Sequence, residues 1–349
     1  MPKRENIAIW LNPDGSLLSK TLQNSREPGK GEALVEVLYS GINPADVKHS
    51  TLGIHSTVSG YDFCGVVKEI GDGCVYDVGD VIAGYTPTGI NRPERFGTHQ
   101  NYLIYPADNL AFHVPPEMKR QDAACLMVIV RTAADAMFNL LQYPLPGETA
   151  SSPLKPLLIW GGATSLGLST IQFAKSIGVP EIFVTASSQH HEWLTKLGAT
   201  KCFDYRDDNV VENIRAYASL SGQVFDRVFD AVGSMQARTA DLALSCAGEG
   251  AIVVTATGHA KCLNPFAITE VDVEIDIPGR GRTVFPARPR DAERAQKALL
   301  WAVEHYGKEF VFPKVSNVSG QVAKAMQTIT AVGRGLAGYG KYVIEHPLF

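Results

Sequence analysis

The feature that most constrains the fold is a short apolar run that leads into a glycine-rich turn and then into a helical pattern. The run is LLIW at 157–160, the turn is GGATSLG at 161–167, and apolar residues recur at helical spacing after it. Four consecutive apolar residues indicate a strand buried on both faces of a parallel sheet. A strand, a small-residue turn and a helix in this order predict the first half of a βαβ unit.

The same alternation continues for about 100 residues. Strand-like and helix-like segments follow one another as IFVTA (182–186), HHEWLTKLGA (190–199), KCFDY (201–205), NVVENIRAYA (209–218), VFDRVFDAV (224–232) and GAIVVTA (250–256). Repeated βαβ units place their strands in one sheet with helices on both faces. The sequence therefore predicts an α/β fold with a doubly wound parallel sheet of the Rossmann type.

The residues before this region have a different pattern. Apolar and alternating runs at 33–42, 64–71 and 80–86 are separated by Gly, Pro and Asp clusters, which is typical of a compact β-barrel-like domain. We expect a first domain over 1–127, a dinucleotide-binding domain over 128–285, and a return to the first domain over 286–349. The segment 268–289 is expected to hold the last strand of the parallel sheet, and the helical pattern at 291–307 is expected to pack on the first domain.

Length and charge narrow the class of protein. A chain of 349 residues exceeds the size of a single hydrophobic core, so two domains are expected. A net charge of −4 gives no reason to expect a nucleic-acid partner. The sequence shows no signal-peptide pattern and no apolar run of membrane-spanning length, so we expect a soluble, cytoplasmic protein without a membrane partner. It leaves the oligomeric state open.

The turn after LLIW is a candidate phosphate-binding loop. Gly162 and Gly167 match the outer glycines of a G-x-G-x-x-G pattern, whereas Thr164 stands at the middle position. Such a turn presents backbone amides and the positive end of a helix dipole to a pyrophosphate. The alternative is a turn whose glycines serve packing alone. The residues expected to bind a cofactor here are Gly162, Ala163, Thr164, Ser165, Leu166 and Gly167.

The end of the next strand bears on the choice of cofactor. NAD-binding folds usually place an acid there to bind the adenosine ribose. Here Ser187 and His190 follow the strand, and the first acid is Glu192. Hydroxyl and imidazole groups can donate to a 2′-phosphate, so NADPH is favoured over NADH. The alternative is that the histidines are solvated residues at the start of a helix.

Seven segments together resemble the zinc-independent branch of the medium-chain dehydrogenase/reductase family, which contains quinone oxidoreductases and enoyl reductases. Within it the chain resembles fungal trans-acting enoyl reductases of polyketide biosynthesis. The resemblance rests on GINPADVK (41–48), GYDFCG (60–65), RTAADAMFNLLQYPLP (131–146), WGGATSLG (160–167), LGATKCFDYRD (197–207), FDAVGS (229–234) and GYGKYVI (338–344). It implies a GroES-like β-barrel domain beside the Rossmann domain.

The resemblance implies that no metal takes part in the reaction. Zinc-dependent members carry a cysteine ligand where this chain has Asn43, and a histidine followed by an acid where it has Tyr61 and Asp62. Neither Asn nor Tyr is a usual zinc ligand. The six cysteines contain no C-x-x-C pair, and the spacings match no structural zinc pattern.

The resemblance also implies roles for single residues. Lys48 matches a lysine that contacts the nicotinamide ribose and is implicated in activity, and Asn43 is a weaker catalytic candidate. The other residues that the resemblance places on the cofactor are Thr132, Ser187, Tyr205, Val232 and Lys341. Without it, Lys48 is an exposed lysine and Asn43 part of an Asn-Pro turn.

His55 replaces a tyrosine that acts near the substrate in mitochondrial enoyl thioester reductases. A histidine could donate a proton or orient a carbonyl, or it could be a loop residue without a role. The expected activity is NADPH-dependent hydride transfer to an α,β-unsaturated carbonyl or thioester. The acyl substrate would be a small molecule or bound to a carrier protein, with a polyketide synthase as the partner. A quinone or alkenal reductase and a non-catalytic NADPH-binding protein remain alternatives.

Overall fold

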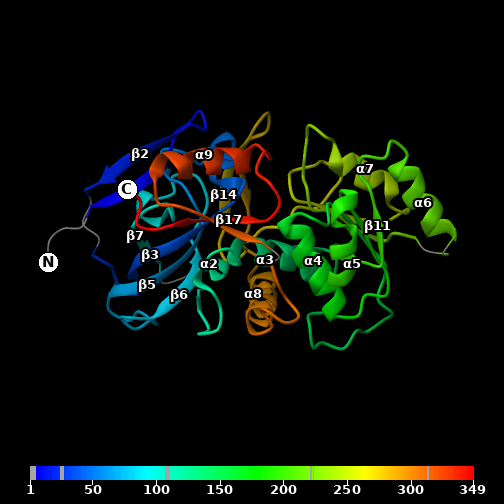
Figure 1. Ribbon diagram of the computed structural model, residues 1–349, viewed down its shortest axis with the longest axis horizontal. Helices are drawn as coiled ribbons and strands as arrows, with labels where there is room; N and C mark the ends of the chain where they lie inside the picture. The colour runs from blue at the N-terminus through cyan, green and yellow to red at the C-terminus, as the bar shows by residue number, and fades with distance from the viewer. Residues whose placement is uncertain (1–4, 24–26, 107–110, 221, 223, 313) are drawn as a thin grey trace. The chain divides into compact units, whose positions relative to one another are not determined.

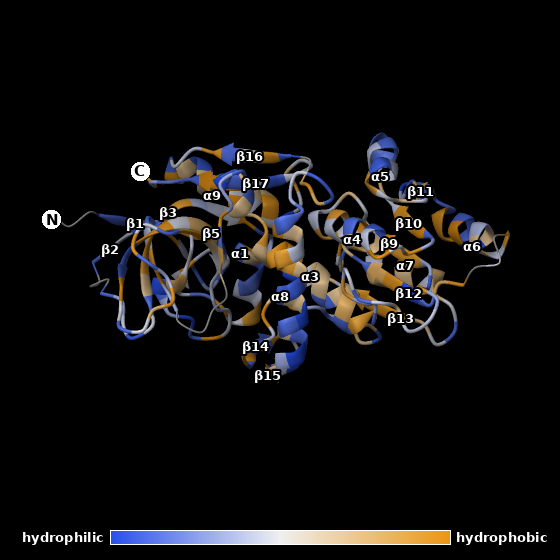
Figure 2. Ribbon diagram, turned by 90° about the horizontal axis from the view of Figure 1, so that it is seen from below, coloured by the Kyte–Doolittle hydropathy of each residue, from blue (hydrophilic) through white to orange (hydrophobic). Residues whose placement is uncertain are grey.

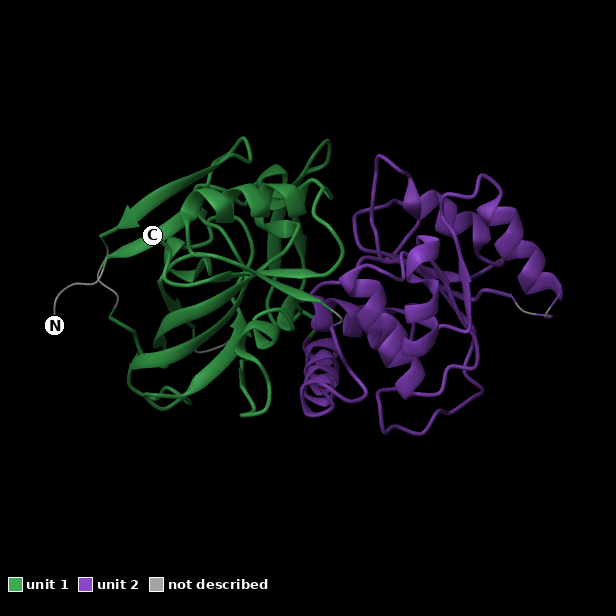
Figure 3. Cartoon of the chain, in the orientation of Figure 1, with its two compact units in different colours: residues 1–128, 268–288, 313–349 green, residues 129–267, 289–312 purple. Residues whose placement is uncertain are grey.

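The computed structural model describes residues 5–23, 27–106, 111–220, 222, 224–312 and 314–349. The chain divides into two compact units (Figure 3). The first unit comprises 1–128, 268–288 and 313–349, and the second comprises 129–267 and 289–312. This division differs from the expected one, because 268–285 belongs to the first unit and 289–312 belongs to the second.

The described part of the second unit contains a five-stranded sheet whose strands are all parallel, in the order β11-β10-β9-β12-β13 (Figure 2). The strands are β9 (Leu157–Trp160), β10 (Ile182–Thr185), β11 (Lys201–Phe203), β12 (Arg227–Asp230) and β13 (Ile252–Thr255). The chain starts at the central strand, winds to one edge, and returns to build the other half. This order confirms the prediction of a doubly wound Rossmann-type sheet.

Helices precede, connect and follow these strands in the chain. They are α3 (Met127–Ala134), which continues as a π-helical segment (Asp135–Leu140), α4 (Ser165–Ser176), α5 (His191–Leu197), α6 (Val210–Leu220), α7 (Thr239–Cys246) and α8 (Pro289–Glu304). β9 and β10 are fully buried, as their continuous apolar runs predict. In the core, the rings of Phe183 and Phe225 meet edge to face at 5.0 Å. Each such buried side chain stabilises the fold by about 1.5–3 kcal/mol.

The first unit is largely β-structure, which confirms the prediction of a β-rich N-terminal domain. In its described residues, one sheet has the order β16-β17-β3-β5-β6-β8, with β7 also paired to β3, and a smaller sheet has the order β2-β1-β4 (Figure 1). The strands are β1 (Asn6–Leu11), β2 (Leu17–Leu22), β3 (Ala33–Ile42), β4 (Thr57–Val58), β5 (Asp62–Ile70), β6 (Val81–Tyr85), β7 (Tyr102–Tyr105), β8 (Phe112–His113), β16 (Val315–Val318) and β17 (Lys341–Glu345).

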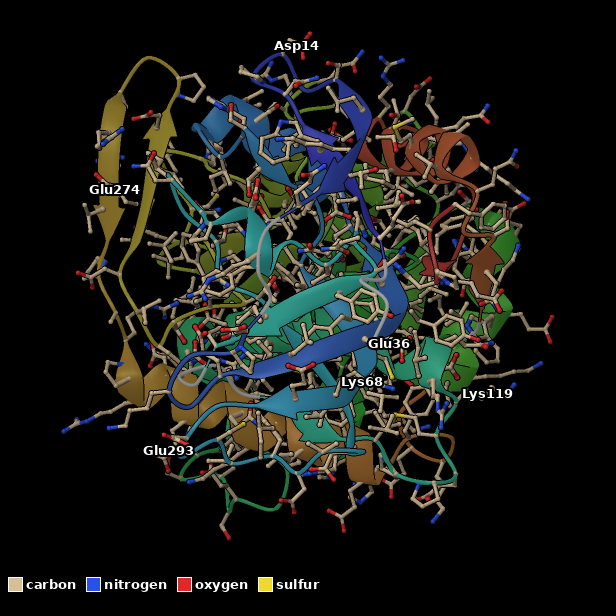
Figure 4. The ribbon with its side chains drawn as sticks, turned by 90° about the vertical axis from the view of Figure 1, so that its left-hand side faces the viewer. Asp14, Glu36, Lys68, Lys119, Glu274 and Glu293 are labelled. Carbon is tan, nitrogen blue, oxygen red and sulfur yellow. The ribbon has the colours of Figure 1, made fainter. Side chains whose placement is uncertain are left out.

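Short helices connect these strands, and one longer helix, α9, follows β16. They are α1 (Ala45–Lys48), the 3-10 helices η1 (His49–Leu52) and η2 (Glu94–Phe96), α2 (Arg120–Ala123) and α9 (Val322–Gly333). On the outer side of the main sheet, Lys68 of β5 forms an ion pair of 3.1 Å with Glu36 of β3 (Figure 4). β17 pairs with β3, so the end of the chain returns to the first unit as predicted. No helix of the described residues is long and apolar enough to span a bilayer.

The prediction of a parallel strand within 268–289 is wrong. The segment forms an antiparallel hairpin of β14 (Val273–Ile277) and β15 (Gly281–Phe285) within the first unit. Its sequence explains the outcome, because apolar residues alternate with acids along EVDVEIDI, which is the pattern of a strand exposed on one face. Gly279 and Gly281 have φ of +75° and +79° and supply the left-handed backbone of the turn.

The position of the helix α8 also differs from the prediction. We expected it to pack on the first domain, but it belongs to the second unit and packs along the π-helical segment. Two hydrogen bonds fix it there. Arg131 donates from Nη1 to Gln296 Oε1 at 2.8 Å, and Asn139 donates from Nδ2 to the Asp291 carbonyl at 3.1 Å.

Candidate functional site

In the second unit, the turn between β9 and α4 needs its glycines for both backbone conformation and space. Gly161 has a φ of +93°, and a Cβ atom on it would overlap the side chain of Val232. A Cβ on Gly162 would lie 2.9 Å from Cβ of Val184, and one on Gly167 would overlap the backbone of the turn itself. The turn therefore keeps its backbone bare, as the approach of a phosphate requires.

Thr164 explains why the middle position of the motif is not glycine. It is the N-cap of α4, and its hydroxyl accepts a hydrogen bond from the Gly167 amide at 2.9 Å. The same hydroxyl lies 2.9 Å from the carbonyl of Gly161 and 3.2 Å from that of Ala231, so it can donate to either. Among the described residues, no acceptor occupies the amides of Ser165 and Leu166, and these amides are free to bind an anion at the helix N-terminus.

Replacing Thr164 with valine is expected to lower the free energy of unfolding of the second unit by about 1 kcal/mol, because valine keeps the shape and removes the cap. Thr164→Ser is the matched control and is expected to lose only a small part of this, since the hydroxyl remains. Urea denaturation of the three proteins tests the expectation. Equal midpoints for Thr164→Val and the wild type would show that the cap contributes nothing.

The end of β12 holds Val232 beside this turn. Asp230 is buried, and its Oδ1 accepts hydrogen bonds from the amides of Val232 and Gly233, both at 3.1 Å. Its other oxygen accepts from the hydroxyls of Thr239 and Thr255, both at 2.9 Å. The carboxylate thus fixes the backbone after β12, while the Val232 side chain stays 40% exposed and available to a ligand.

The predicted adenosine side lies at the ends of β10 and β11. Ser187 is buried, His190 is half-buried, and the Ser187 carbonyl accepts from the His190 amide at 2.9 Å. Tyr205 is 47% exposed, and the Arg206 guanidinium lies 5.0 Å from the centre of its ring.

An acid also lies at this edge, which the sequence did not reveal. The carboxylate of Asp204 accepts from the amides of Ser188 at 3.2 Å and Arg206 at 3.0 Å. Hydrogen bonding to the Arg206 amide is the main cause that lowers the pKa of Asp204. The edge therefore carries Asp204 and Arg206 on one turn, which also holds Asp207 and Asp208.

Three further predicted residues lie on separate elements. Thr132 is half-buried on α3 in the second unit. In the first unit, Lys48 is exposed at the last position of α1. His55 is half-buried in the loop between η1 and β4, with its Nδ1 3.2 Å from the Ser56 hydroxyl.

Asn43 and Lys341, by contrast, are in direct contact. The buried Lys341 ammonium donates to Asn43 Oδ1 at 2.8 Å and to the Ile42 carbonyl at 3.0 Å. Asn43 in turn donates from Nδ2 to Asp62 Oδ2 at 2.9 Å. The resulting row of ammonium, amide and carboxylate joins β17, the turn after β3 and the start of β5.

Burial sets the ionisation of this row. Desolvation raises the pKa of Asp62 to about 6, although the Lys341 charge and the hydrogen bonds from Asn43 and the Val128 amide act in the opposite direction. At neutral pH the carboxylate is therefore largely ionised and faces the ammonium through one amide. Lys341 acts here within the protein, and its predicted contact with a cofactor stays a prediction.

A second buried row begins at Asp46, which the sequence analysis did not single out. Its Oδ2 accepts from the Asn43 amide at 2.8 Å and lies 3.1 Å from His99 Nε2. The Ser40 hydroxyl lies 2.9 Å from His99 Nδ1 and 2.9 Å from His346 Nε2. The Asn-Pro turn is thus held on one side by Lys341 and on the other by a row of side chains that ends at His346, directly after β17.

Comparison with known proteins places these features in a family. Residues 29–116 match the alcohol dehydrogenase GroES-like domain, and residues 165–286 match the zinc-binding dehydrogenase domain. The chain is 31% identical over 220 residues to the trans-enoyl reductase tazE of Aspergillus terreus, which covers 60% of this chain and 72% of the relative. The chain belongs to the medium-chain dehydrogenase/reductase family.

Two further proteins are similar to this chain, one in sequence and one in structure. The trans-enoyl reductase resD of Aspergillus sclerotiorum is 28% identical over 292 residues, which cover 78% of this chain and 80% of the relative. The crystal structure of an alcohol dehydrogenase superfamily protein from Novosphingobium aromaticivorans superposes with a TM-score of 0.72 at 21% identity, over 99% of this chain and all of that one. The latter likeness concerns the fold alone.

The residues of this chain do not suit the metal that zinc-binding members of the medium-chain dehydrogenase/reductase family hold. The oxygen of Asn43 accepts from an ammonium, and a cation placed there would be repelled by Lys341. The Tyr61 hydroxyl is bonded to His49. Within the described residues no cluster of three or more His, Cys, Asp or Glu side chains could hold a metal ion.

The cysteines also lack the character of metal ligands. All six are free thiols, and those at positions 64, 125 and 246 are buried. Desolvation raises the pKa of the Cys64 and Cys125 thiols to about 12, so both are protonated.

Sequence reasoning missed Asp46, His99, His49 and Gly161. Gly161 carried a signal, because a glycine directly after a buried strand indicates a left-handed turn. The others carried none, since their side-chain partners lie 12 to 59 positions away in the chain and no periodicity links them.

Proposed function

We propose that the protein is an NADPH-dependent reductase that transfers hydride to an activated double bond, the C=C of an α,β-unsaturated carbonyl or thioester. We further propose that it acts in trans in fungal polyketide biosynthesis, on an acyl chain presented by a carrier protein or released from it. One observation carries the proposal. The turn before α4 keeps a bare glycine backbone at a helix N-terminus, whereas Asn43, which the resemblance aligns with a zinc ligand, is bonded to the Lys341 ammonium. A double bond conjugated to a carbonyl suits reduction without a Lewis acid, because its own carbonyl takes up the charge that hydride transfer develops.

The residues of the second unit suit the cofactor. The amides of Ser165 and Leu166 at the start of α4 would hold the pyrophosphate. Ser187 and His190 would hold the 2′-phosphate, and the exposed Val232 would line the nucleotide. When bound, NADPH supplies the hydride. The Asp204 carboxylate opposes a 2′-phosphate by its charge, and the Arg206 guanidinium favours it, so cofactor preference tests this part of the proposal.

In the first unit, Lys48 is the exposed cation at the end of α1, where its ammonium can donate to a ribose hydroxyl or to the oxygen of the substrate. A donor at that oxygen stabilises the negative charge that develops during reduction. Asn43 is buried with its amide bonded on both sides. We propose that it positions the α1 segment.

Binding and turnover test the proposal together. We expect NADPH to bind more tightly than NADH by fluorescence titration, and a simple enoyl thioester to be reduced. Turnover of a quinone alone would move the protein to the quinone reductases, and tight NADPH binding without turnover of any enone would support a non-catalytic role. Failure to bind either nucleotide would refute the interpretation of the β9–α4 turn.

Replacing Ser187 with aspartate is expected to weaken NADPH binding about tenfold, or ~1.4 kcal/mol, and to leave NADH binding within about twofold, because the new carboxylate repels the 2′-phosphate. Thr195→Asp adds the same charge on the exposed side of α5 and is the matched control. Fluorescence titration with both nucleotides measures the effect. Equal losses for NADPH and NADH would place the 2′-phosphate elsewhere.

A further inference from the structure

A tyrosine–histidine pair, formed by a buried tyrosine and a half-buried histidine, lies at the start of β5. Tyr61 is only 5% exposed, and its hydroxyl lies 2.8 Å from Nδ1 of His49. The two rings meet edge to face, with centroids 5.2 Å apart. The Thr88 hydroxyl is the second partner of the Tyr61 oxygen, at 3.5 Å. The phenol is therefore held by an imidazole that can exchange a proton with it.

The charge beside the pair favours loss of a proton from Tyr61. The Arg92 guanidinium lies 4.4 Å from the centre of the Tyr61 ring. It is itself fixed, because its Nη2 donates to the Gly60 carbonyl at 2.7 Å and to the Thr86 hydroxyl at 2.6 Å. A phenolate formed at Tyr61 would face this cation, and the Coulomb attraction between them is strong in a buried setting. The carboxylate of Asp46 is the acid that acts on both rings.

Both members of the pair are neutral at neutral pH. Desolvation raises the pKa of Tyr61 above its usual value, with Arg92 acting in the opposite direction. Desolvation also lowers the pKa of His49 to about 4. The pair therefore rests as a phenol next to a neutral imidazole, the state from which a proton can be donated and then replaced.

The pair is adjacent in the chain to residues that the proposed function uses. His49 directly follows Lys48, and Tyr61 directly precedes Asp62, whose carboxylate holds Asn43. His55, the other candidate for a proton donor, lies in a loop, and its Nδ1 contacts the hydroxyl of the neighbouring Ser56. Of the two, only the Tyr61 hydroxyl has both a proton-exchanging partner and a cation next to the charge it would leave.

We propose that Tyr61 is the proton donor to the α-carbon and that His49 replaces the proton. The proposal rests on the reductase activity proposed above, in which hydride from the nicotinamide forms the C–H bond at the β-carbon and the C=C electron pair moves onto the carbonyl as an enolate. The Tyr61 O–H bond then breaks as a C–H bond forms at the α-carbon. His49 passes its Nδ1 proton to the phenolate while its Nε2 takes a proton from water. The substrate gains one hydride and one proton, and the protein returns to its starting charge.

Tyr61→Phe keeps the ring and removes the proton. We expect kcat for an enoyl thioester to fall about 100-fold, with KM and NADPH affinity within about twofold, because a positioned general acid contributes about 10²- to 10⁴-fold. Tyr85→Phe is the matched control. Tyr85 is a buried tyrosine of the same unit whose hydroxyl donates to Glu270 at 3.0 Å, and its removal is expected to change kcat less than twofold.

Turnover in D₂O measures the configuration of deuterium at the α-carbon of the product, which a purely structural role of Tyr61 would leave unchanged. In the wild type, deuterium is expected to enter the α-carbon with one configuration, because the donor is fixed on one face. In Tyr61→Phe, water protonates the enolate, and both configurations are expected. His49→Asn is the second variant, expected to lower kcat about tenfold while it keeps one configuration. In the protein without ligands, the ¹⁵N shift of His49 Nδ1 is expected to change in Tyr61→Phe and not in Tyr85→Phe.

The outcomes separate this inference from the proposed function. If the wild type reduces the thioester and Tyr61→Phe matches it in kcat and in the configuration of the product, the proton donor is another group while the reductase activity stands. If the wild type reduces no enone or enoyl thioester, the proposed function fails first. If Tyr61→Phe does not fold, His49→Asn is the variant that tests the proposal. An unchanged kcat in His49→Asn would overturn the proposed proton transfer from His49 to Tyr61.

Discussion

Replacing Lys341 with methionine is expected to lower the free energy of unfolding of the first unit by about 3–5 kcal/mol, because the change leaves a buried carboxylate without its cation. The Lys341 charge is the main influence that keeps the pKa of Asp62 from rising further. Methionine has a similar length and no donor, so the Asn43 oxygen and the Ile42 carbonyl lose their partner as well. Urea denaturation at pH 7 measures the change.

Two controls separate charge from packing in this experiment. Lys324→Met makes the same substitution at an exposed position of α9 and is expected to stay within about 0.5 kcal/mol of the wild type. Adding Asp62→Asn to Lys341→Met removes the unpaired carboxylate and is expected to recover part of the loss. The deficit of the single variant is also expected to shrink at pH 5, where Asp62 is protonated. If the loss in free energy of unfolding changes neither with pH nor with the second substitution, lost packing and not the unpaired buried charge causes it.

The parts of the fold that follow from local patterns could be predicted from the sequence. The run LLIW, the glycines after it and the helix that follows are adjacent in the chain, and short-range periodicity is enough to identify them. The same holds for the strand order of the second unit, which the alternation of strands and helices nearly determines. The hairpin β14–β15 was misplaced because its strands were judged by their position after a Rossmann region and not by their alternating polarity.

The candidate site depends on contacts that local patterns do not specify. Lys341 meets Asn43 across 298 positions, and Ser40 meets His346 across 306. The resemblance placed Lys341 near a cofactor, and only the structure shows that its ammonium is engaged inside the protein. Thr164 illustrates the same limit at short range. From the sequence, Thr164 was only a deviation from the glycine motif. Its three hydroxyl contacts in the structure show that it caps the helix and fixes the turn.

Lowering the pH from 7 to 5 is expected to reduce the free energy of unfolding by about 2–3 kcal/mol, because two histidines are held neutral inside the first unit. Desolvation lowers the pKa of His346 to about 3, with His99 adding to the effect, and lowers that of His49 to about 4. In the unfolded chain both titrate near 6.5, so between pH 6.5 and 4 the unfolded state binds more protons and is favoured as the pH falls.

Asp62 acts with the opposite sign over part of this range. Its pKa in the folded protein is about 6 against 3.8 for the ordinary side chain, so the folded state takes up a proton there and gains stability on acidification. One carboxyl group offsets part of the loss from two histidines, which leaves a net destabilisation. Half-buried acids whose pKa values are lowered, such as Asp80 and Asp241, add to the loss only below about pH 4.

The variant that isolates this effect is His346→Asn, which keeps a polar partner for Ser40 and removes the titrating ring. We expect its loss of stability between pH 7 and 5 to be about a quarter of that of the wild type, because Asp62 offsets most of the loss that His49 alone still causes. His113→Asn removes an exposed histidine beside Asp80 and is expected to leave the loss unchanged within about 0.5 kcal/mol. If His346→Asn and the wild type lose the same stability between pH 7 and 5, the His346 ring is not held neutral in the folded protein. The hydrogen-bonded row from Asp46 to His346 would then carry a positive charge on His346 at pH 5.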